Sequence, residues 1–306
     1  MGIESQWIWM DGELVPFADA KVHVLAHTLH YGLGAFEGIR AYQQPDGRPG
    51  IWRLDEHLER LFDSLKMARM TPSCSREDIK KACVEVMLKN GFTEAYLRPL
   101  AFFGMGAMGL GARNNPVHMV VAAWKWGAYL GDEGLKNGVR LRTSSFSRNH
   151  PNAALSRAKI VGHYVNSIMA RYEANDDGFE EALMLDHLGF VAEGTGENVF
   201  VMKGGIVKTP PVANILPGIT RKSVMDILDH EGVPVKEQLF GRDAFYVAEE
   251  AWMCGTAAEV TPIASLDRRP VGVGRPGPLT LKVQQLYADG VRGRIDWLRD
   301  GITVCG

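Results

Sequence analysis

The sequence predicts an α+β protein made of two domains. Short runs of alternating hydrophobicity lie in neighbouring pairs with turn residues between them, which is typical of antiparallel strands. Four longer stretches carry apolar residues at helical spacing. The glycine-rich residues 125–138 lose all periodicity, as a linker does. We therefore expect a small N-terminal α/β domain at 1–124, a linker at 125–138 and a larger C-terminal domain at 139–306, although this length also allows one large domain.

The first half is expected to begin with strands. Residues 7–16 alternate around Asp11-Gly12, which predicts a hairpin with a tight turn. A second extended pair is expected around residues 23–32 and 37–54. Pro45-Asp46-Gly47, inside the second of these runs, is expected to form a turn between strands.

Two helices should follow in this half. Apolar residues from Leu54 to Leu65 have a helical period, with Asp55 as the expected N-cap. A second helix should start at Ser75 and stop at Asn90-Gly91, burying Ile79, Ala82, Cys83, Val86 and Met87. Strand-like runs then cover Ala95–Phe103 and Val117–Trp124.

The second half mixes short strands with two helices. The helices are expected at Tyr164–Ala174 and at residues 220–231, where Val224, Ile227 and Leu228 face inward and Gly232 ends the helix. The strands are expected at Val139–Ser145, Glu181–Asp186, Phe190–Ala192, Asn198–Met202, Ile206–Lys208 and Ala251–Cys254.

Composition points toward an enzyme that acts on small molecules, without deciding the matter. With 34 basic and 36 acidic residues the net charge is −2, so nothing indicates a nucleic-acid partner. No apolar window is long enough to span a membrane, and residues 1–13 lack a secretory signal. Cys74, Cys83, Cys254 and Cys305 form no CxxC pair, which argues against a disulfide framework and a zinc site. We expect a reduced, cytoplasmic protein.

One motif suggests a dinucleotide site. Gly104, Gly106 and Gly109 form a literal GxGxxG after a strand-like run. The following Leu-Gly-Ala-Arg-Asn-Asn-Pro cannot open a helix, so no helix N-terminus would meet a pyrophosphate. A glycine-rich loop is the expected structure, and an NAD-dependent oxidoreductase is the rival function from another class.

A better phosphate candidate is Leu216-Pro-Gly-Ile-Thr-Arg221. Gly218 frees the backbone and Thr220 offers a hydroxyl where a helix with unpaired N–H groups begins. Thr256, after Gly255, could donate a second hydroxyl and amide. An ordinary capped helix and a plain turn explain the same residues.

Several basic side chains can be explained either by a role in binding or by an ordinary structural or solvent-exposed position. Arg40 and Arg98 lie in strand-like contexts, where a buried guanidinium would need an anion such as a substrate carboxylate. Exposure at a sheet edge explains them equally well, and Arg60 could be a solvated helix residue. His27 and His30 lack further ligands at metal spacing, so we expect them to be structural.

One long gapped pattern decides between these interpretations. The chain contains Glu193-Gly-Thr-Gly-Glu-Asn-Val-Phe200, then Val207-Lys-Thr209 and Leu216-Pro-Gly-Ile-Thr-Arg221. This string resembles the signature of the class IV pyridoxal-phosphate aminotransferases. Further segments resemble the branched-chain amino acid aminotransferases, particularly the bacterial kind: HYGLGAFEGIRAY at 30–42, HLERLFDS at 57–64, AYLRPL at 95–100, WGAYLG at 126–131 and CGTAAEVTPI at 254–263.

The resemblance implies fold type IV, with two α/β domains, pyridoxal 5′-phosphate at their interface, and a homodimer or higher homo-oligomer. The implied reaction transfers the amino group of L-leucine, L-isoleucine or L-valine to 2-oxoglutarate. It implies that Lys159 forms the Schiff base with the cofactor, that Glu193 faces the pyridine nitrogen and that Tyr164 binds the ring O3′. The implied phosphate ligands are Arg60, Ile219, Thr220 and Thr256.

The same resemblance assigns the substrate residues. Tyr96 and the backbone of Thr256, Ala257 and Ala258 would bind the α-carboxylate, and Arg98, with Arg40 behind it, the second carboxylate of glutamate. Tyr31 and the loop 108–110, including Leu110, would come from the partner subunit. The apolar pocket would be lined by Phe36, Gly38, Trp126, Tyr129 and Tyr164.

The chain also departs from its relatives. Near Lys159 the family often has small residues and an asparagine, where this chain has Arg157, Ile160 and His163. D-amino-acid aminotransferase, (R)-amine transaminase and aminodeoxychorismate lyase share the implied fold and are the nearest alternatives. The segments FEGIRAY and GTAAE favour the branched-chain group.

Overall fold

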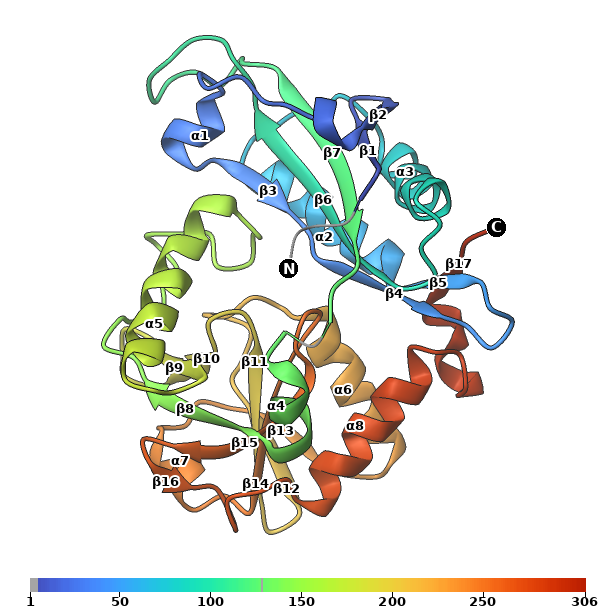
Figure 1. Cartoon of the computed structure of the whole chain (residues 1–306). Coiled ribbons are helices and arrows are strands. Elements are labelled where there is room, and N and C mark those ends of the chain that lie inside the picture. The colour runs from blue at the N-terminus through green and yellow to red at the C-terminus, as the bar shows by residue number, and fades with distance from the viewer. Residues whose placement is uncertain (1–4, 128) are drawn as a thin grey trace. The chain divides into compact units, whose positions relative to one another are not determined.

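The computed structural model describes residues 5–127 and 129–306, so the predicted features at residues 1–4 and at Ala128 lie outside it. Contacts within the chain define two compact units (Figure 1). The first contains the chain up to Trp126, together with Ala158–His163 and Gly290–Gly306. The second contains Gly127–Arg157 and Tyr164–Asp289. Each has its own sheet and helices, and the α+β class is confirmed.

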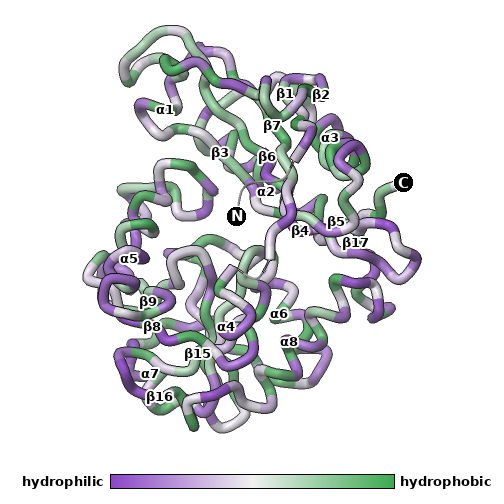
Figure 2. Tube along the Cα trace, in the orientation of Figure 1, coloured by the Kyte–Doolittle hydropathy of each residue, from purple (hydrophilic) through white to green (hydrophobic). Residues whose placement is uncertain are grey.

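The sheet of the first unit is antiparallel, with strand order β17-β5-β4-β6-β7-β1-β2 and with β3 also paired to β6. The Asp11-Gly12 hairpin is confirmed, because both residues have positive φ, as a tight turn requires. Figure 2 shows that β6 and β7 are largely hydrophobic, whereas the turn between β4 and β5 is hydrophilic. The strands are β1 (Trp7–Met10), β2 (Glu13–Pro16), β3 (Gly34–Phe36), β4 (Ile39–Gln43), β5 (Pro49–Trp52), β6 (Ala95–Phe103), β7 (Val117–Trp124) and β17 (Ile302–Val304).

The helices α2 (Leu54–Met67) and α3 (Arg76–Lys89) contact each other and the sheet. The prediction for α3 is confirmed: Ser75 and Asp78 form a capping box, and all five predicted apolar residues are buried. Short helices complete the unit: α1 (His27–Tyr31) and the 3₁₀ turns η1 (Phe17–Asp19), η2 (Val161–His163) and η3 (Asp296–Gly301).

Two local predictions in this unit are wrong. Asp55 does not cap α2; its carboxylate pairs with Lys80, while the N-cap residue is Arg53 in the left-handed region. The expected strand at 23–32 contains α1, which ends at Gly32 with φ of 73°. A helix this short does not repeat its apolar spacing, so periodicity could not reveal it.

The sheet of the second unit has strand order β10-β9-β8-β15-β14-β11-β12-β13, with β16 paired to β15. Most pairs are antiparallel, but β8 runs parallel to β9 and β15, and β12 runs parallel to β13. The strands are β8 (Val139–Thr143), β9 (Glu181–Leu185), β10 (Val191–Glu193), β11 (Asn198–Lys203), β12 (Ile206–Thr209), β13 (Val235–Glu237), β14 (Glu250–Gly255), β15 (Glu259–Leu266) and β16 (Arg269–Pro270).

Helices pack against this second sheet. Those predicted at 164–174 and 220–231 are confirmed as α5 (Tyr164–Asp176) and α6 (Ile219–His230), and α6 buries the expected Val224, Ile227 and Leu228. The remaining helices are α4 (Gly131–Asn137), α7 (Asp243–Tyr246) and α8 (Pro278–Gly290). Within the described residues no helix has the length and apolar character required to cross a bilayer.

The units differ from the predicted domain ranges in three segments. Half of the predicted linker folds as α4, which contacts β15. Residues 158–163 and 290–306 belong to the first unit because Ala35 bridges Ile160 and β17 pairs with β5. These long-range pairings leave no local pattern in the sequence. The predicted division into domains at 124 and 139 stays a prediction.

Candidate active site

Lys159 is held in the first unit by its backbone. Its N–H donates to the Ser64 hydroxyl at 3.0 Å, and its carbonyl accepts from the Phe36 N–H at 3.1 Å. Ser64 is buried and donates to the Arg60 carbonyl one turn earlier in α2, at 2.8 Å. The lysine predicted to react and the arginine predicted to bind phosphate are therefore tied to the same helix.

Arg60 belongs to a buried ion pair. Its Nε and Nη2 donate to the two oxygens of Glu37 at 2.7 and 2.9 Å, a bidentate contact that fixes the guanidinium plane. His57, three residues earlier on α2, places Nδ1 2.7 Å from the same carboxylate. The Arg60 side chain is only 11% exposed, so the structure excludes the interpretation of Arg60 as a solvated helix residue.

Arg98 is surrounded by aromatic rings. Its guanidinium carbon lies 4.7 Å from the ring centre of Phe36, 5.5 Å from that of Tyr96 and 5.6 Å from that of Trp124. Its Nε is buried and has no hydrogen-bond partner among the described residues. The Lys159 amine lies 5.0 Å from the Phe36 ring, so two basic side chains share one aromatic ring. Such a site suits a carboxylate, which would neutralise the buried positive charge.

The other predicted substrate residues of this unit surround the same rings. Tyr96 contacts Trp126 edge-on with ring centres 4.6 Å apart, and Arg40 donates to the Trp126 carbonyl at 3.0 Å. At Gly38 an added Cβ would lie 1.8 Å from the Tyr96 hydroxyl, so the close approach requires glycine.

Tyr31 and Leu110, predicted to serve a partner subunit, are exposed; Leu110 is 91% exposed. The glycine run at 104–111 forms bends and turns, and no helix lies between Gly104 and Pro116, so the dinucleotide motif lacks its helix. His27 binds the Gly109 carbonyl at 2.8 Å through Nε2, which agrees with a structural role. No group suited to a metal ion occurs in the part of the chain that the structure describes.

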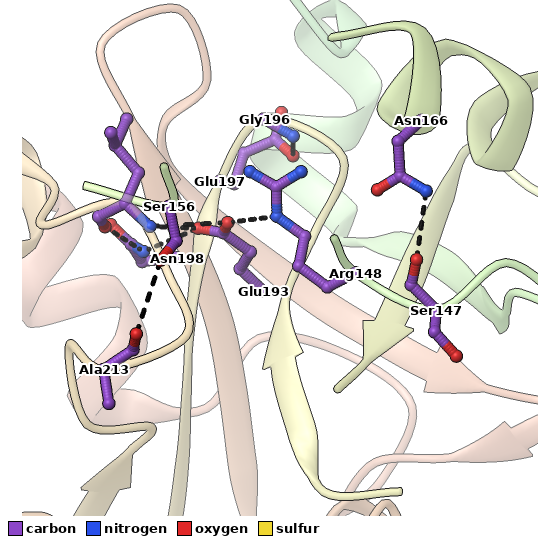
Figure 3. Close-up of polar contacts among 10 residues, drawn as sticks. Ser147, Arg148, Ser156, Asn166, Glu193, Gly196, Glu197, Asn198 and Ala213 are labelled. Atoms are coloured by element: carbon purple, nitrogen blue, oxygen red, sulfur yellow. Dashed lines mark hydrogen bonds and ion pairs between the residues drawn. The ribbon is translucent and has the colours of Figure 1, made fainter. Parts of the chain in front are cut away.

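Glu193 is the centre of the polar site in the second unit. Its side chain is buried and accepts from Arg148 Nε at 2.6 Å, from Asn198 Nδ2 at 3.2 Å and from the Leu216 N–H at 3.3 Å. Figure 3 shows Arg148 and Glu193 directed toward each other. Arg148 Nη1 is buried without a hydrogen-bond partner in the described chain. These donors orient Glu193 and complement a negative charge on it.

The predicted phosphate residues of this unit lie at α6 and at one turn. Gly218 is the N-cap of α6 and offers no side chain to the first amides, so these donors suit an anion. An added Cβ there would lie 1.9 Å from the Asn198 amide oxygen. Ile219 and the buried Thr220 open the helix. Thr256, Ala257 and Ala258 form the turn between β14 and β15.

Tyr129, Tyr164 and the residues just described lie in the second unit, while Lys159, Arg60 and the Arg98 rings lie in the first. The structure thus groups the predicted site residues into two sets. Their individual roles stay predictions.

The comparison with known proteins identifies the family. A family model for class IV amino-transferases matches residues 34–266. This chain belongs to the class IV aminotransferase family. A branched-chain-amino-acid aminotransferase of Pseudomonas aeruginosa is 48% identical over 289 residues, covering 94% of each chain. The enzyme of that name from Escherichia coli K12 is 43% identical over 93% of this chain and 92% of its own.

Solved structures of branched-chain amino acid aminotransferases are also similar to this class IV aminotransferase along its whole length. The branched-chain amino acid aminotransferase of T.th. with pyridoxamine 5′-phosphate matches with a TM-score of 0.96 at 43% identity, covering 100% of both chains. The same enzyme complexed with N-(5′-phosphopyridoxyl)-L-glutamate matches with a TM-score of 0.95, also over the whole of both chains.

Sequence reasoning did not assign roles to several residues that hold the site of this aminotransferase. Glu37 and His57 hold Arg60, Ser64 holds the Lys159 backbone, and Arg148 and Asn198 hold Glu193. His57, Arg60 and Ser64 share one face of α2 at helical spacing, which could have grouped them. Arg148 precedes Glu193 by 45 residues, and no sequence signal joins the two.

A buried acidic pair lies beside the Glu193 turn of this aminotransferase. Burial, together with neighbouring Glu181, raises the pKa of Glu197 to about 8. Burial also raises the pKa of Glu181, although Arg171 opposes it. Burial and Glu197 raise the pKa of Tyr129, so the predicted pocket residue lies among charged groups.

We expect the stability of the protein to fall between about pH 5 and pH 8.5. Glu197 keeps its proton in the folded state up to about pH 8, whereas the unfolded chain releases it near pH 4.5. The contribution of this group to the free energy of unfolding is therefore complete below pH 4.5 and is lost as the pH rises through about 8. Glu197→Gln should remove much of this loss, on the order of 3 kcal/mol. Urea midpoints at both pH values measure it, with exposed Glu85→Gln as the control; parallel pH curves for wild type and Glu197→Gln would contradict the assignment.

Proposed function

We propose that this chain is a branched-chain amino acid aminotransferase, which transfers the amino group of L-leucine, L-isoleucine or L-valine to 2-oxoglutarate with pyridoxal 5′-phosphate as cofactor. The observation that best supports this proposal is the placement of Arg98 and the Lys159 amine around the Phe36 ring, beside Tyr96 and Trp124. An aromatic surface with a buried, unsatisfied guanidinium donor suits both an alkyl chain and a carboxylate.

The residues present fit the cofactor. A phosphorylated pyridine needs a phosphate site, a carboxylate for its ring nitrogen and a donor for its phenolic oxygen. The uncapped start of α6 with Thr220 in the second unit could bind a phosphate, and so could Arg60 in the first unit. Glu193 could face the ring nitrogen, and Tyr164 could donate to the phenolic oxygen. Bound pyridoxal phosphate provides an electron sink for the charge left on the substrate Cα when its proton is removed.

The protein's own residues then manage protons and orientation. Lys159 supplies the amine that accepts the proton from the substrate Cα and later returns one, a role that requires its backbone to be fixed as Ser64 and Phe36 fix it. Glu193 holds a proton on the ring nitrogen, and Arg148 and Asn198 keep its carboxylate in place. Tyr164 would donate to the phenolic oxygen of the bound cofactor.

The aromatic rings and the Arg98 guanidinium together account for a site that accepts both a branched alkyl side chain and the second carboxylate of glutamate. Burial of a leucine-sized side chain against Phe36, Tyr96 and Trp126 is worth about 1.5–3 kcal/mol. Arg98 pairs with the second carboxylate of glutamate or 2-oxoglutarate. The complex of the T.th. enzyme with a phosphopyridoxyl-L-glutamate supports a site able to accept glutamate in this family.

Two copies of the chain form the functional unit in this proposal. Apolar side chains are exposed in each unit: Val24, Leu29 and Leu110 in the first, and Val165, Ile168 and Tyr172 along one face of α5 in the second. Exposed apolar surface of this kind is typical of a protein interface. Sedimentation equilibrium should give a dimer or a multiple of it, and a stable monomer would contradict this part of the proposal.

The enzyme is also proposed to be cytoplasmic. All four cysteines are free, which agrees with a reducing compartment, where disulfides are rare. Detection of the protein outside the cytoplasmic fraction would contradict this location.

The absorbance of the purified protein tests the reaction. We expect a visible band of bound cofactor that declines when L-valine is added and returns when 2-oxoglutarate follows. D-alanine and an (R)-amine should leave the band unchanged. A response to either of those compounds, and none to L-valine, would favour the D-amino-acid or (R)-amine transaminases. A colourless protein that responds to no amine would contradict the proposal as a whole.

A further inference from the structure

Glu37 is a fully buried carboxylate that has no place in the proposed reaction. It lies between β3 and β4, flanked by Phe36 and Gly38, and its N–H donates to the Pro99 carbonyl at 2.8 Å. The Phe36 ring faces Arg98, and Gly38 lies against Tyr96. The Glu37 side chain instead reaches α2. One short segment therefore contacts both the aromatic cluster and the helix that carries Arg60.

The contacts of Glu37 are directional. Both of its oxygens accept from Arg60, and Oε2 also lies 2.7 Å from His57 Nδ1 and 3.3 Å from the Gly38 N–H. A bidentate carboxylate restricts a guanidinium to one plane and one position. His57 and Gly38 restrict the carboxylate in turn.

The charge state agrees with this arrangement. Burial raises the pKa of Glu37, but Arg60 and His57 outweigh that effect and hold the pKa well below its usual range. Burial lowers the pKa of His57, so its imidazole is neutral near pH 7. The cluster thus contains one carboxylate and one guanidinium.

Stability alone is a weak reason for such a pair. Well-packed apolar residues in place of a buried ion pair are often as stabilising or more so, because both charges must be desolvated. What the pair supplies is a fixed position for Arg60, on the same helix whose Ser64 holds the Lys159 backbone. A phosphate ligand would gain from a guanidinium already in place, since no side-chain freedom is then lost on binding.

We propose that Glu37, held by His57, is a positioning residue that orients Arg60 for the phosphate of the cofactor. This inference rests on the proposed function, in which Arg60 binds that phosphate. Glu37 does not touch the cofactor, and it acts through the guanidinium. Its loss should therefore weaken recognition of the phosphate and spare recognition of the pyridine ring.

Comparison of two ligands tests the proposal. Dissociation constants of pyridoxal 5′-phosphate and of unphosphorylated pyridoxal are measured on the cofactor-depleted full chain by quenching of tryptophan fluorescence. Glu37→Gln should weaken the phosphorylated ligand on the order of tenfold, as loss of an outer partner of a ligating residue does elsewhere, and leave pyridoxal unchanged. Arg60→Met should do the same or more. In the double variant, Glu37→Gln should add no further loss.

Two more variants keep the test decisive. Glu37→Asp retains the ion pair but displaces the guanidinium, so it should show the same phosphate-specific loss even if Glu37→Gln folds poorly. Glu250→Gln removes another buried carboxylate, one bound to Thr280 in the second unit, and should affect neither ligand selectively.

The outcomes separate the two proposals. Equal weakening of both ligands by Glu37→Gln and Glu37→Asp would overturn the positioning role, as would a further loss in the double variant. Phosphate-specific loss in Arg60→Met alone would also overturn it while leaving the proposed function intact. If Arg60→Met binds both ligands like the wild type, Arg60 is not the phosphate ligand, and that part of the proposed function fails.

Discussion

Lys159→Ala is expected to reduce turnover of L-leucine with 2-oxoglutarate by roughly four orders of magnitude or more, because it removes both the covalent attachment and the proton carrier. The Arg98 guanidinium, which also lies over the Phe36 ring, cannot form the covalent link or carry the proton. The visible absorbance of the bound cofactor should shift or disappear as well. Steady-state kinetics and an absorbance spectrum measure both effects.

A surface lysine provides the control for this substitution. Lys203→Ala, at the exposed end of β11, should retain the activity and the spectrum of the wild type. The Lys159→Ala backbone keeps its hydrogen bonds to Ser64 and Phe36, so its thermal unfolding should stay close to that of the wild type. A persistent visible band together with measurable turnover in Lys159→Ala would show that another residue bears the cofactor.

Arg98→Met is expected to impair the reactions of glutamate and 2-oxoglutarate and to leave that of L-leucine nearly unchanged. The methionine keeps an apolar stem among the rings of Phe36, Tyr96 and Trp124 but removes the charge that receives the second carboxylate. Loss of a buried partner for a carboxylate is worth about 3 kcal/mol, so kcat/KM for glutamate and 2-oxoglutarate should fall roughly a hundredfold. The value for L-leucine should stay near that of the wild type.

Half-reactions followed by absorbance measure each substrate alone, and exposed Arg113→Met is the matched control. Equal losses for leucine and glutamate would mean that Arg98 supports the aromatic cluster and does not read the carboxylate. A loss for leucine alone would contradict the assignment outright.

Local patterns predicted the regular elements well. The helix α3 was predictable from its capping serine to the glycine after it, because spacing, cap and stop all agree within one stretch. The start of α2 was not, because the chain enters it through Arg53, whose N–H donates to the distant Gly301 carbonyl. Asp55 has the side chain of an N-cap but finds Lys80 instead. Contacts formed between distant segments overrode the local preference in both features.

The candidate site divides in the same way. Glu193 and the start of α6 could be singled out because each lies in a short motif whose residues are contiguous along the chain. Lys159 has neighbours that depart from the family's pattern, so its predicted role depends on the resemblance of the rest of the chain. The partners that hold these residues could not be singled out. Glu37 precedes Arg60 by 23 residues and Arg148 precedes Glu193 by 45, and both pairings depend on how strands and helices meet in space.

The sequence was therefore sufficient for the family and the reaction, since a motif carries both the residue types and their spacing. The residues assigned to the chemistry stay predictions. Folding in three dimensions was needed to show what orients those residues. Periodicity states which face of an element is buried and not which partner it meets there. For this reason no local pattern distinguishes Glu37 within FEGIRAY, although it is among the most deeply buried acids of the described chain and holds the arginine on which phosphate recognition is proposed to depend.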